Sequence, residues 1–414
     1  MTLRPFRSVC LDVTRLVSRV GAGPRTGIDR VEYAYLRELL SRTPPLFGLA
    51  RTSTGFVLLN QYGLRALRAR IDGTEPWGSA DFEAKLSRRV SPSRRRAEAD
   101  LRRFAVARSR KGGLSDLLAL HLPAGALYLN TGHSNLDGTV FSAIRRVKDA
   151  RSVVLVHDTI PLRRPDLQRP GTVARFDEKM SAVAEGADIV ICSTEAERGH
   201  IEREIQRRGG RPKFVTAPLG IDVPVPGPFV QVAPPDGPFF AVVGTIEPRK
   251  NLQLLIRIWN RLADELRPSR VPGLCIIGRR GWEAPGTLAC LDALKARCSE
   301  VREYSALDDG AKGAIVSKAR ALLFPTLDEG FGLPPLEALA LGTPVVCSDL
   351  RVFRETMGNA PVYADPADMY HWIGVVRDLA GDGDAMRADV RSRTQGLVLP
   401  TWQAHINRVL STIP

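Results

Sequence analysis

The sequence predicts an α/β protein made of two domains, each built on an open parallel sheet. Short apolar runs of strand length alternate with longer stretches of helical periodicity along most of the chain. The alternation stops at residues 223–238, "VPVPGPFVQVAPPDGP", where six prolines in sixteen residues exclude a long helix or a central strand. It then begins again, so the 414 residues fit at least two domains.

The first half begins with a strand near residues 7–13, which is followed by a helix in "TGIDRVEYAYLRELL". The helix is indicated by apolar side chains at helical spacing, namely Ile28, Val31, Tyr35 and Leu39. Thr26, followed three residues later by Asp29, is typical of a capping box. Three further apolar runs, each fitting a strand buried on both faces of a parallel sheet, lie at 125–133, 152–161 and 187–194.

The second half repeats the pattern, with strands in "FFAVVGT", "GLCIIGRRG", "ARALLFPT" and "TPVVCSD" and a long helix in "NLQLLIRIWNRLADEL". We therefore expect an N-terminal domain over 1–225, a proline-rich linker over 226–238 and a second domain over 239–396. The segment "TWQAHINRVLSTI" predicts a final helix within 397–414. Because ligands bind at the carboxyl ends of strands in such sheets, we expect a ligand-binding cleft between the domains.

The cysteines favour reduced thiols in a cytosolic protein. The six cysteines stand at positions 10, 192, 275, 290, 298 and 347, without a Cys-x-x-Cys pair or a histidine cluster, so neither a disulfide framework nor a zinc site is expected. The sequence "MTLRPFRSVCLDV" lacks the apolar stretch of a signal peptide. No apolar run reaches the length of about 18 residues that a membrane-spanning helix needs.

The positive charge lies entirely in the first half. Residues 1–235 hold 38 Lys and Arg against 24 Asp and Glu, whereas residues 236–414 hold 21 of each kind. The net charge of +14 therefore belongs to the expected N-terminal domain. Such an asymmetry indicates an anionic partner for that half, for which a membrane surface, a nucleic acid and an acidic substrate are candidates.

Residues 85–111 are especially basic, with ten positive charges after Lys85 against Glu98 and Asp100. One interpretation is a solvated surface helix or loop, and another is a contact with anionic lipid headgroups. A nucleic-acid-binding function that uses residues 88–111 is a third. It is the weakest, because Phe104 is the one aromatic residue there and no nucleic-acid-reading motif is present.

A strand–turn–helix in "GTIEPRKNLQLLIRIW" predicts an anion site. Gly244 at the strand end allows a close backbone approach, and Arg249 and Lys250 stand just before the helix. The amide groups of a helix start and two cations together suit a diphosphate. A surface turn with two solvated cations is the alternative.

The stretch "PTLDEGFGLPPLEALALGTPVV" holds Glu329 in a glycine-rich loop and Glu337 in the first turn of the helix that follows. Two glycines and two prolines separate the glutamates, so no continuous helix joins them. Acidic residues are favoured at helix starts by the dipole, which accounts for Glu337 alone. A carboxylate at Glu329 can accept hydrogen bonds from sugar hydroxyls.

This stretch closely resembles the nucleotide-sugar motif of glycosyltransferase family 4, in which two glutamates are separated by seven residues. "VVGTIEPRKNL", "CIIGRRGWE" and "TWQAHINRVL" resemble family motifs in order and approximate spacing, and "VVLVHDTIPL" and "TGIDRV" do so more loosely. The likeness covers most of the second half and scattered motifs of the first. It is nearest to the bacterial mannosyltransferases that build O-antigen, capsule and exopolysaccharide.

The resemblance implies the GT-B fold, in which two Rossmann-like domains face a cleft and the C-terminal helix returns to the N-terminal domain. It implies that Glu329 contacts the donor sugar, Glu337 the ribose and Lys250 the diphosphate. His157 corresponds to a residue placed against the donor sugar, and Gly27 to a loop near the phosphates and the acceptor. Thr245 stands where the family often has an arginine, so either Arg249 supplies the second cation or the diphosphate is held with one charge fewer.

We accordingly expect a retaining, metal-independent hexosyltransferase without a cofactor, with His157, Arg249, Lys250 and Glu329 as catalytic residues. The predicted donor-binding residues are Gly27, Gly244, Thr245, Arg249, Lys250, Glu329, Gly330, Phe331, Gly332, Leu333 and Glu337. The expected partners are a nucleotide sugar, with GDP-mannose favoured, a glycan or polyprenyl-diphosphate-linked acceptor and an anionic membrane surface, but no nucleic acid. This implies a cytoplasmic protein, peripheral on the inner face of the membrane.

Alternatives on the same fold are a sugar-nucleotide epimerase and a phosphorylase. A dehydrogenase is disfavoured, because "GAGPRTG" has the wrong spacing for a dinucleotide fingerprint. Asp382 and Asp384 form an Asp-x-Asp pair that fits a turn and a helix start better than a metal site. His133 could line a cleft or be a satisfied surface histidine, and Glu355 matches a common family glutamate or caps local structure.

Overall fold

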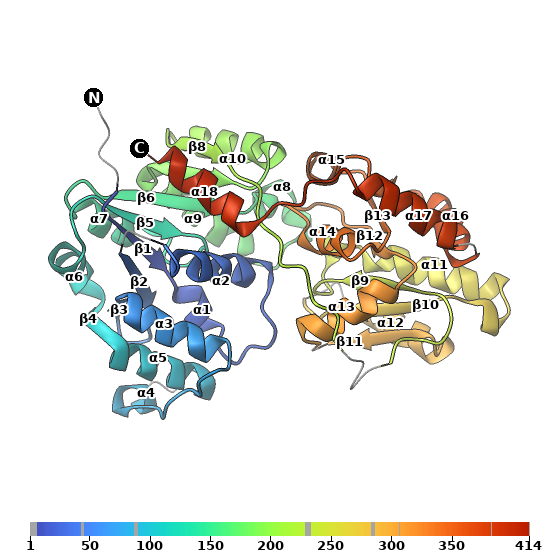
Figure 1. Cartoon of the computed structure of the whole chain (residues 1–414), viewed down its shortest axis with the longest axis horizontal. Helices are drawn as coiled ribbons and strands as arrows, with labels where there is room; N and C mark the ends of the chain where they lie inside the picture. Colours follow the sequence, from blue (N-terminus) through green and yellow to red (C-terminus); the bar gives the residue numbers. More distant parts are fainter. Residues whose placement is uncertain are drawn as a thin grey trace. The chain divides into compact units, whose positions relative to one another are not determined.

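The structure is a computed structural model that describes residues 6–42, 45–86, 90–227, 233–282, 286–305, 307–381 and 383–413 (Figure 1). The chain divides into two compact units. Unit 1 comprises residues 1–162, 170–220 and 401–414, and unit 2 comprises residues 163–169 and 221–400. All six cysteines are free thiols, and five of them are buried.

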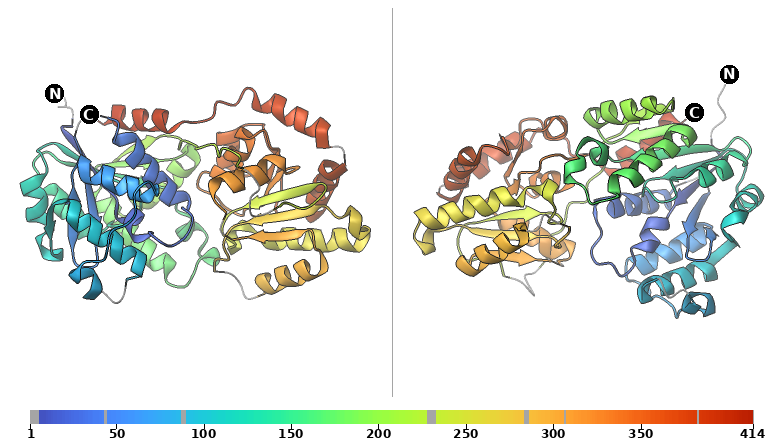
Figure 2. Two further views of the ribbon diagram at one scale, coloured as in Figure 1. Left: turned by 60° about the horizontal axis from the view of Figure 1, so that its bottom comes forward. Right: turned by 180° about the vertical axis from the view of Figure 1, so that it is seen from behind.

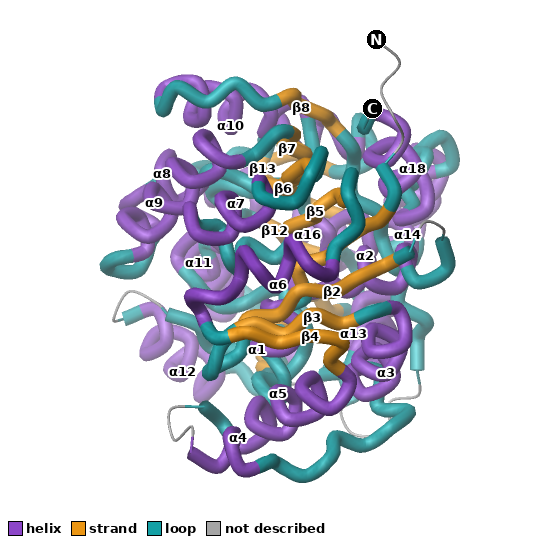
Figure 3. The backbone as a smooth tube through the Cα atoms, turned by 90° about the vertical axis from the view of Figure 1, so that its left-hand side faces the viewer, coloured by secondary structure: helices purple, strands orange, loops and turns teal. Residues whose placement is uncertain are grey.

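Unit 1 is built on an eight-stranded sheet in the order β4-β3-β2-β1-β5-β6-β7-β8. Its strands are β1 (Ser8–Asp12), β2 (Leu46–Arg51), β3 (Phe56–Leu59), β4 (Ala105–Ser109), β5 (Ala126–Asn130), β6 (Arg151–Val156), β7 (Ile189–Cys192) and β8 (Lys213–Thr216). Six neighbouring strands run parallel to one another, namely β2, β1, β5, β6, β7 and β8. Strand β3 runs antiparallel to both of its neighbours, β2 and β4. Figure 3 shows β2, β3 and β4 side by side at one edge. The strands predicted from the four apolar runs of the first half are confirmed.

Helices cover this sheet because most of them bury one apolar stripe against it. They are α1 (Thr14–Ser18), α2 (Gly27–Leu39), α3 (Gln61–Ile71), α4 (Phe82–Leu86), α5 (Pro92–Phe104), α6 (Leu114–His121), α7 (Gly138–Arg145), α8 (Ile160–Arg163), α9 (Thr172–Gly186), α10 (Glu195–Arg207) and α18 (Trp402–Thr412). Helix α4 packs instead on α5, and α18 on α2. The capping box at the start of α2 is confirmed, because Asp29 accepts the backbone N–H of Thr26 at 2.8 Å.

The basic segment 85–111 is neither one helix nor a loop. The described part holds α5 and then β4, an edge strand that pairs with β3. Exposed Val106 and Arg108 alternate with partly buried neighbours along β4, which is the period of a strand with one face on the core. Interpreting the whole segment as a surface helix or loop was therefore wrong. The strand was not predicted because its short alternation lies among arginines, which hide the pattern in the sequence.

Unit 2 carries six parallel strands in the order β11-β10-β9-β12-β13-β14. They are β9 (Phe239–Val243), β10 (Gly273–Ile277), β11 (Val301–Tyr304), β12 (Leu322–Phe324), β13 (Val345–Ser348) and β14 (Val362–Ala364). Numbered within the unit, this order is 3-2-1-4-5-6, that of a dinucleotide-type doubly wound sheet. The chain reverses its direction of growth between β9 and β12, and ligands bind at such a switch point.

Unit 2's helices lie on both faces of its sheet and are α11 (Leu252–Glu265), α12 (Thr287–Arg297), α13 (Asp309–Lys318), α14 (Leu333–Ala340), α15 (Arg351–Met357), α16 (Met369–Gly381) and α17 (Gly383–Thr394). The long yellow helix in Figure 2 is α11. Its buried residues join apolar side chains of α12, α16 and the sheet in one core that includes Trp259 and Trp372. An apolar layer of this kind fixes the strand ends, and hence the loops that follow them.

The expected linker packs on unit 2 where it is described. Gly227 donates its N–H to the carbonyl of Gly310 at 3.1 Å. Arg302 and Tyr304 both donate to the carbonyl of Ala233, at 2.9 and 3.2 Å. The division by contacts accordingly places residues 221–238 with the second unit.

Helix α18 belongs to unit 1, as the C-terminal helix of the expected fold should. Its His405 is 2 % exposed and lies 2.7 Å from the hydroxyl of Tyr35 on α2, through Nε2. The other ring nitrogen, Nδ1, faces the carbonyls of Ala217 and Pro218 at 3.2 and 3.0 Å. Because a carbonyl only accepts, Nδ1 carries the proton and Nε2 accepts from Tyr35, which is the neutral ring. Burial lowers the pKa of His405 from its ordinary 6.5 to about 4.

We expect Tyr35→Phe to lower the free energy of unfolding by about 1–2 kcal/mol, because Nε2 of His405 loses its buried donor. The wild type should also lose stability as the pH falls from 6.5 to 4, since the unfolded chain binds a proton there that the folded ring excludes. Denaturant titration at pH 7.5 and pH 5 measures both effects. Tyr370→Phe, at a tyrosine that is 73 % exposed, makes the same chemical change and should leave stability unchanged. Equal losses in the two variants would contradict the expectation.

Candidate functional site

Two loops of unit 2 meet at the switch point of its sheet. The first, Gly244–Asn251, follows β9, and the second, Pro325–Gly332, follows β12. The loops are joined by hydrogen bonds, because the carbonyl of Arg249 accepts from the N–H of Leu327 at 2.8 Å and from the hydroxyl of Thr326 at 3.0 Å. The residues that the sequence singled out on the two sides are thus held in one place.

Glycine is required at two positions of these loops. Gly244 has a φ of +144°, and Gly332, at the start of α14, has a φ of +92°. A Cβ on Gly332 would lie 2.6 Å from the ring of Phe353. Both the backbone conformation and the space therefore disfavour any larger residue at Gly332.

Two cations converge on one carboxylate oxygen at the centre of the site. The Lys250 ammonium donates to Oε2 of Glu329 at 2.5 Å, and the Arg249 guanidinium donates to the same oxygen at 2.9 Å. The three side chains are 14 %, 19 % and 15 % exposed for Lys250, Arg249 and Glu329. This is a compact, partly desolvated charge cluster rather than a turn with two solvated cations.

Further side chains hold the cluster in place. Glu247 accepts two hydrogen bonds from the Arg249 guanidinium, at 3.1 and 2.8 Å. Asp328 accepts the backbone N–H of Glu329 at 2.8 Å and the guanidinium of Arg163 at 2.9 Å. Arg163 comes from the short segment 163–169 of unit 2. Glu247 therefore orients Arg249, and Asp328 holds the backbone of Glu329 in place.

The cluster shifts the pKa values of its members. Burial by itself raises the pKa of Glu329, but Arg249 and Lys250 outweigh it and bring the pKa down to about 2. Burial lowers the pKa of Lys250, and Glu329 opposes this effect. Glu329 is consequently a carboxylate at any physiological pH.

Glu337 lies in the second turn of α14, not in the first, because the helix begins at Leu333. The first-turn prediction was wrong by one residue, since a chain that leaves Gly332 enters the helix directly. The helix dipole acts mainly within the first turn and so does not account for Glu337. Its side chain is almost fully buried and lies 3.6 Å from the Lys312 ammonium on α13. A buried carboxylate beside a lysine indicates a specific role.

The other predicted residues of unit 2 line the same loops. Thr245 follows Gly244 and is half-buried. The backbone from Gly330 to Leu333 is buried where it enters α14, and Phe331 is 5 % exposed. The predicted donor-binding residues of unit 2 therefore surround the switch point between β9 and β12.

The two predicted residues of unit 1 stand on different elements of its fold. Gly27 is the first residue of α2, and a Cβ there would meet no atom within 4 Å. His157 directly follows β6, is 9 % exposed, and places Nε2 2.8 Å from the carbonyl of Thr131. Burial lowers the pKa of His157 to about 4, so the ring is neutral at pH 7, with its proton on Nε2.

His133 joins His157 at the same sheet edge. The ring centroids are 4.9 Å apart, and His133 Nε2 lies 3.0 Å from the carbonyl of Leu155. Its φ of +56° is unusual for a residue that is not glycine, and such strain is often found at functional sites. Burial lowers its pKa well below the ordinary value. His133 is therefore tied to the strand ends rather than being a free surface side chain.

Sequence reasoning missed four residues of the site, which are Arg163, Glu247, Lys312 and Asp328. Asp328 and Glu247 adjoin recognised motifs, so charge complementarity with Arg249 could have indicated them. Arg163 and Lys312 are distant in sequence and carried no signal. Glu355 is an exposed residue of α15.

In the described ranges no group of three or more His, Cys, Asp or Glu side chains is arranged to hold a metal ion. Asp382 and the side chain of Asp384 lie outside the described residues. Among the helices that the structure describes, none has both the length and the apolar character needed to cross a membrane.

Comparison with known families identifies the second unit. Residues 228–394 match the family model described as "Glycosyl transferases group 1". The chain therefore contains a glycosyltransferase group 1 domain, which occupies most of unit 2. The charge cluster and Glu337 both lie inside this domain.

The most similar curated proteins include bacterial mannosyltransferases. O-antigen chain mannosyltransferase B of Escherichia coli is 39 % identical over 127 residues, which are 31 % of this chain and 32 % of that protein. Serotype-specific mannosyltransferase WbdA of Escherichia coli is 29 % identical over 301 residues, covering 65 % of this chain and 34 % of the relative. O-antigen chain mannosyltransferase RfbU of Salmonella typhimurium is 31 % identical over 149 residues, 36 % of this chain and 40 % of RfbU. The matches thus span only about a third to two fifths of these relatives.

Solved structures confirm the expected GT-B class. A sucrose-phosphate synthase from Thermosynechococcus elongatus is 15 % identical, with a TM-score of 0.62 over 98 % of both chains. Anabaena Alr3699/HepE, solved in complex with UDP and glucose, is 14 % identical, with a TM-score of 0.61 over 98 % of this chain and 100 % of its own. At these identities the likeness concerns the fold, which extends through both units.

Proposed function

We propose that the protein is a retaining, metal-independent hexosyltransferase of family 4 that acts in bacterial surface-glycan synthesis. The donor is a nucleotide sugar, with GDP-mannose favoured, and the acceptor is a glycan or a polyprenyl-diphosphate-linked sugar. The names of the relatives, O-antigen and serotype-specific mannosyltransferases, support the sugar and the pathway class.

The observation that carries the proposal is the convergence of Arg249 and Lys250 at the switch point of the group 1 domain. The diphosphate of the donor approaches these cations, so Arg249 supplies the second positive charge that Thr245 cannot. Glu329, whose Oε2 accepts hydrogen bonds from both side chains in the free protein, then turns its second carboxylate oxygen to hydroxyls of the donor sugar. Glu337, with Lys312 beside it, accepts a hydrogen bond from the ribose.

The cations act on the leaving group. As the bond between the anomeric carbon and the diphosphate oxygen breaks, negative charge grows on that oxygen and positive charge on the sugar ring. Positioned cations stabilise the growing negative charge and so lower the barrier. The acceptor hydroxyl attacks from the face that the diphosphate leaves, and its proton passes to a diphosphate oxygen. This preserves the anomeric configuration without a covalent intermediate on the protein.

His157 and Gly27 contribute from unit 1 in this proposal. The neutral ring of His157 carries its proton on Nε2, so Nδ1 is free to accept a hydrogen bond from a sugar hydroxyl. The first turn of α2, which begins at Gly27, approaches the phosphates and the acceptor.

Membrane docking through the basic first half remains part of the proposal. Three arginines of α5 already form ion pairs within the protein. Arg94 pairs with Glu98, Arg102 with Asp81 and Arg103 with Asp100. One face of the Phe104 ring is covered by a cation–π contact, because the Arg70 guanidinium lies 4.6 Å from the ring centroid. A ring covered in this way is unsuited to base stacking, which disfavours the nucleic-acid alternative.

The test is an assay of the purified chain with GDP-, UDP- and dTDP-sugars and a polyprenyl-diphosphate-linked sugar acceptor. We expect one donor to yield a lengthened acceptor, detected by mass spectrometry, with retained anomeric configuration by NMR and undiminished rate in a chelator. An isomerised donor without acceptor would identify an epimerase instead. Sugar transfer only to or from free phosphate would identify a phosphorylase.

We expect Glu337→Gln to raise KM for the donor about tenfold and to leave kcat within about twofold, because a uniform binding contact contributes to substrate and transition state alike. Glutamine keeps the volume of this buried side chain, and steady-state kinetics with varied donor separates the two constants. Asp378→Asn, at an exposed residue of α16, is the charge-matched control. A fall in kcat as large as the rise in KM would contradict a ribose contact.

A further inference from the structure

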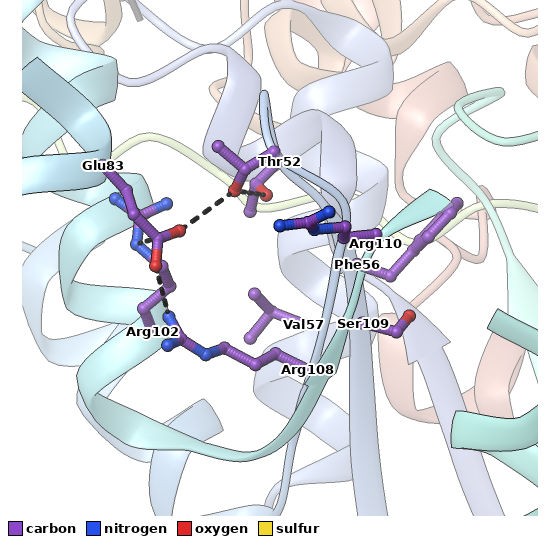
Figure 4. A pocket seen from close by; sticks show the side chains of 9 residues that line it. Thr52, Phe56, Val57, Glu83, Arg102, Arg108, Ser109 and Arg110 are labelled. Carbon is purple, nitrogen blue, oxygen red and sulfur yellow. Dashed lines mark hydrogen bonds and ion pairs between the residues drawn. The ribbon is translucent and has the colours of Figure 1, made fainter. Parts of the chain in front are cut away.

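We propose that a pocket of unit 1, separate from the charge cluster of unit 2, binds the phosphoryl group of a phosphorylated sugar. The cavity has a volume of about 610 Å³ and is lined by Thr52, Thr54, Phe56, Val57, Glu83, Arg102, Arg108, Ser109 and Arg110 (Figure 4). The predicted transfer chemistry does not use this pocket.

The pocket lies at one edge of the unit 1 sheet, where three strands end or begin. Thr52 follows β2, Phe56 begins β3, and Ser109 ends β4. Because β3 is antiparallel to its neighbours, these three points face one another, and Phe56 is paired in register with Ser109. Glu83 of α4 and Arg102 of α5 close the pocket. The fold thus brings five elements, β2, β3, β4, α4 and α5, to one pocket.

Arg102 supplies a buried donor. Its side chain is 4 % exposed, and its Nε and one terminal nitrogen bind the Asp81 carboxylate at 2.7 and 2.6 Å. The remaining nitrogen, Nη1, is buried and has no hydrogen-bond partner among the residues that the structure describes. Leaving such a group unsatisfied is costly, and an anion in the pocket would satisfy it.

Two exposed arginines add charge at the mouth. Arg108 donates to Glu83 at 2.9 Å, whereas Arg110 makes no ion pair within the described ranges. Figure 4 shows both guanidinium groups extending from β4 toward the side of the cavity where Glu83 lies. Arg102 is paired with Asp81 and Arg108 with Glu83, so Arg110 gives the pocket an excess of one positive charge. Planar guanidinium groups bind phosphate oxygens through paired hydrogen bonds.

The rest of the lining suits a sugar. The hydroxyls of Thr52 and Thr54 and the carboxylate of Glu83 can exchange hydrogen bonds with sugar hydroxyls, and Val57 adds an apolar side chain. The volume is that of a small-ligand site. A phosphate with a hydroxylated body therefore matches the pocket better than a bare ion. That body can belong to a free sugar phosphate or to a lipid-borne phosphosugar.

The test is binding of mannose 6-phosphate to the full chain, measured by equilibrium dialysis in a Lys250→Ala background, which weakens phosphate binding in unit 2. We expect Arg110→Gln to weaken binding at least fivefold and Arg96→Gln, at an exposed arginine of α5 outside the pocket, to leave it unchanged. Bound ligand should also protect Arg110, but not Arg96, from phenylglyoxal. Unphosphorylated mannose should not compete.

A second arm presents a polyprenyl phosphomannose in neutral phospholipid vesicles and measures cosedimentation. Binding of either probe that depends on Arg110 supports the pocket, and the probe that binds more tightly identifies the source. Binding of neither probe, or equal losses in Arg96→Gln and Arg110→Gln, would overturn the proposal. The outcome is independent of transfer activity, because no step here requires a nucleotide sugar.

Discussion

Replacing Lys250 with alanine is expected to lower kcat by about 100- to 1,000-fold and to raise KM for the donor. Removal of one preorganised electrostatic stabiliser has this size of effect in acyl-transfer enzymes, and the leaving diphosphate carries at least as much charge. Lys250 is held 2.5 Å from Glu329 and 4.3 Å above the Phe324 ring, in a position where water contributes little screening. Steady-state kinetics with varied donor gives both constants.

The control is Lys318→Ala, which removes a lysine from the exposed end of α13 in the same unit. It should leave both constants unchanged, and thermal unfolding should show that both variants are folded. If Lys250→Ala kept its kcat and changed only KM, Lys250 would serve donor binding alone and not the leaving group.

Replacing Glu329 with glutamine is expected to lower kcat about 100-fold without raising KM for the donor. Glutamine has nearly the same shape but cannot neutralise Arg249 and Lys250. The diphosphate then meets Lys250 without its carboxylate partner and Arg249 paired with Glu247 alone, so it binds at least as tightly, while the contact that orients the sugar weakens. Lys250→Ala should therefore raise KM for the donor, whereas Glu329→Gln should not. A loss of folding in both variants could not produce this difference.

The double variant sharpens this test. Because Lys250 and Glu329 touch, their effects on kcat/KM should be non-additive, whereas Glu329→Gln and Asp378→Asn should add. With a pKa of about 2, Glu329 is charged throughout the range of an ordinary assay, so an acid limb between pH 5 and 8 would belong to another group. An acid limb in that range that vanished in Glu329→Gln would contradict this assignment.

The sequence predicted the fold well because most of its strands and helices have distinct local patterns of apolar residues. The buried strands of both parallel sheets are continuous apolar runs, and α11 shows its buried stripe plainly. Strand β4 was missed because five residues of weak alternation lie among arginines, and its place is decided by pairing with β3. Tertiary pairing of this kind overrides local preference at sheet edges.

The candidate site was predictable to the extent that its residues stand in motifs. Arg249, Lys250 and Glu329 were placed correctly at the ends of two strands, but nothing local shows that both cations share one oxygen. That contact depends on β9 and β12 being neighbours in the sheet. Lys312 could not be predicted either, because it meets Glu337 only through the packing of α13 beside α14.

The return of α18 to unit 1 affects how the chain is assembled during synthesis. Unit 2 is nearly continuous in sequence, from residue 221 to residue 400, whereas unit 1 needs residues from both sides of it. Domains that emerge complete can fold as units on the ribosome. Unit 2 is therefore able to close its core before α18 has joined unit 1. Until α18 is in place, Tyr35 and its neighbours on α2 lack the contacts with His405 that complete unit 1.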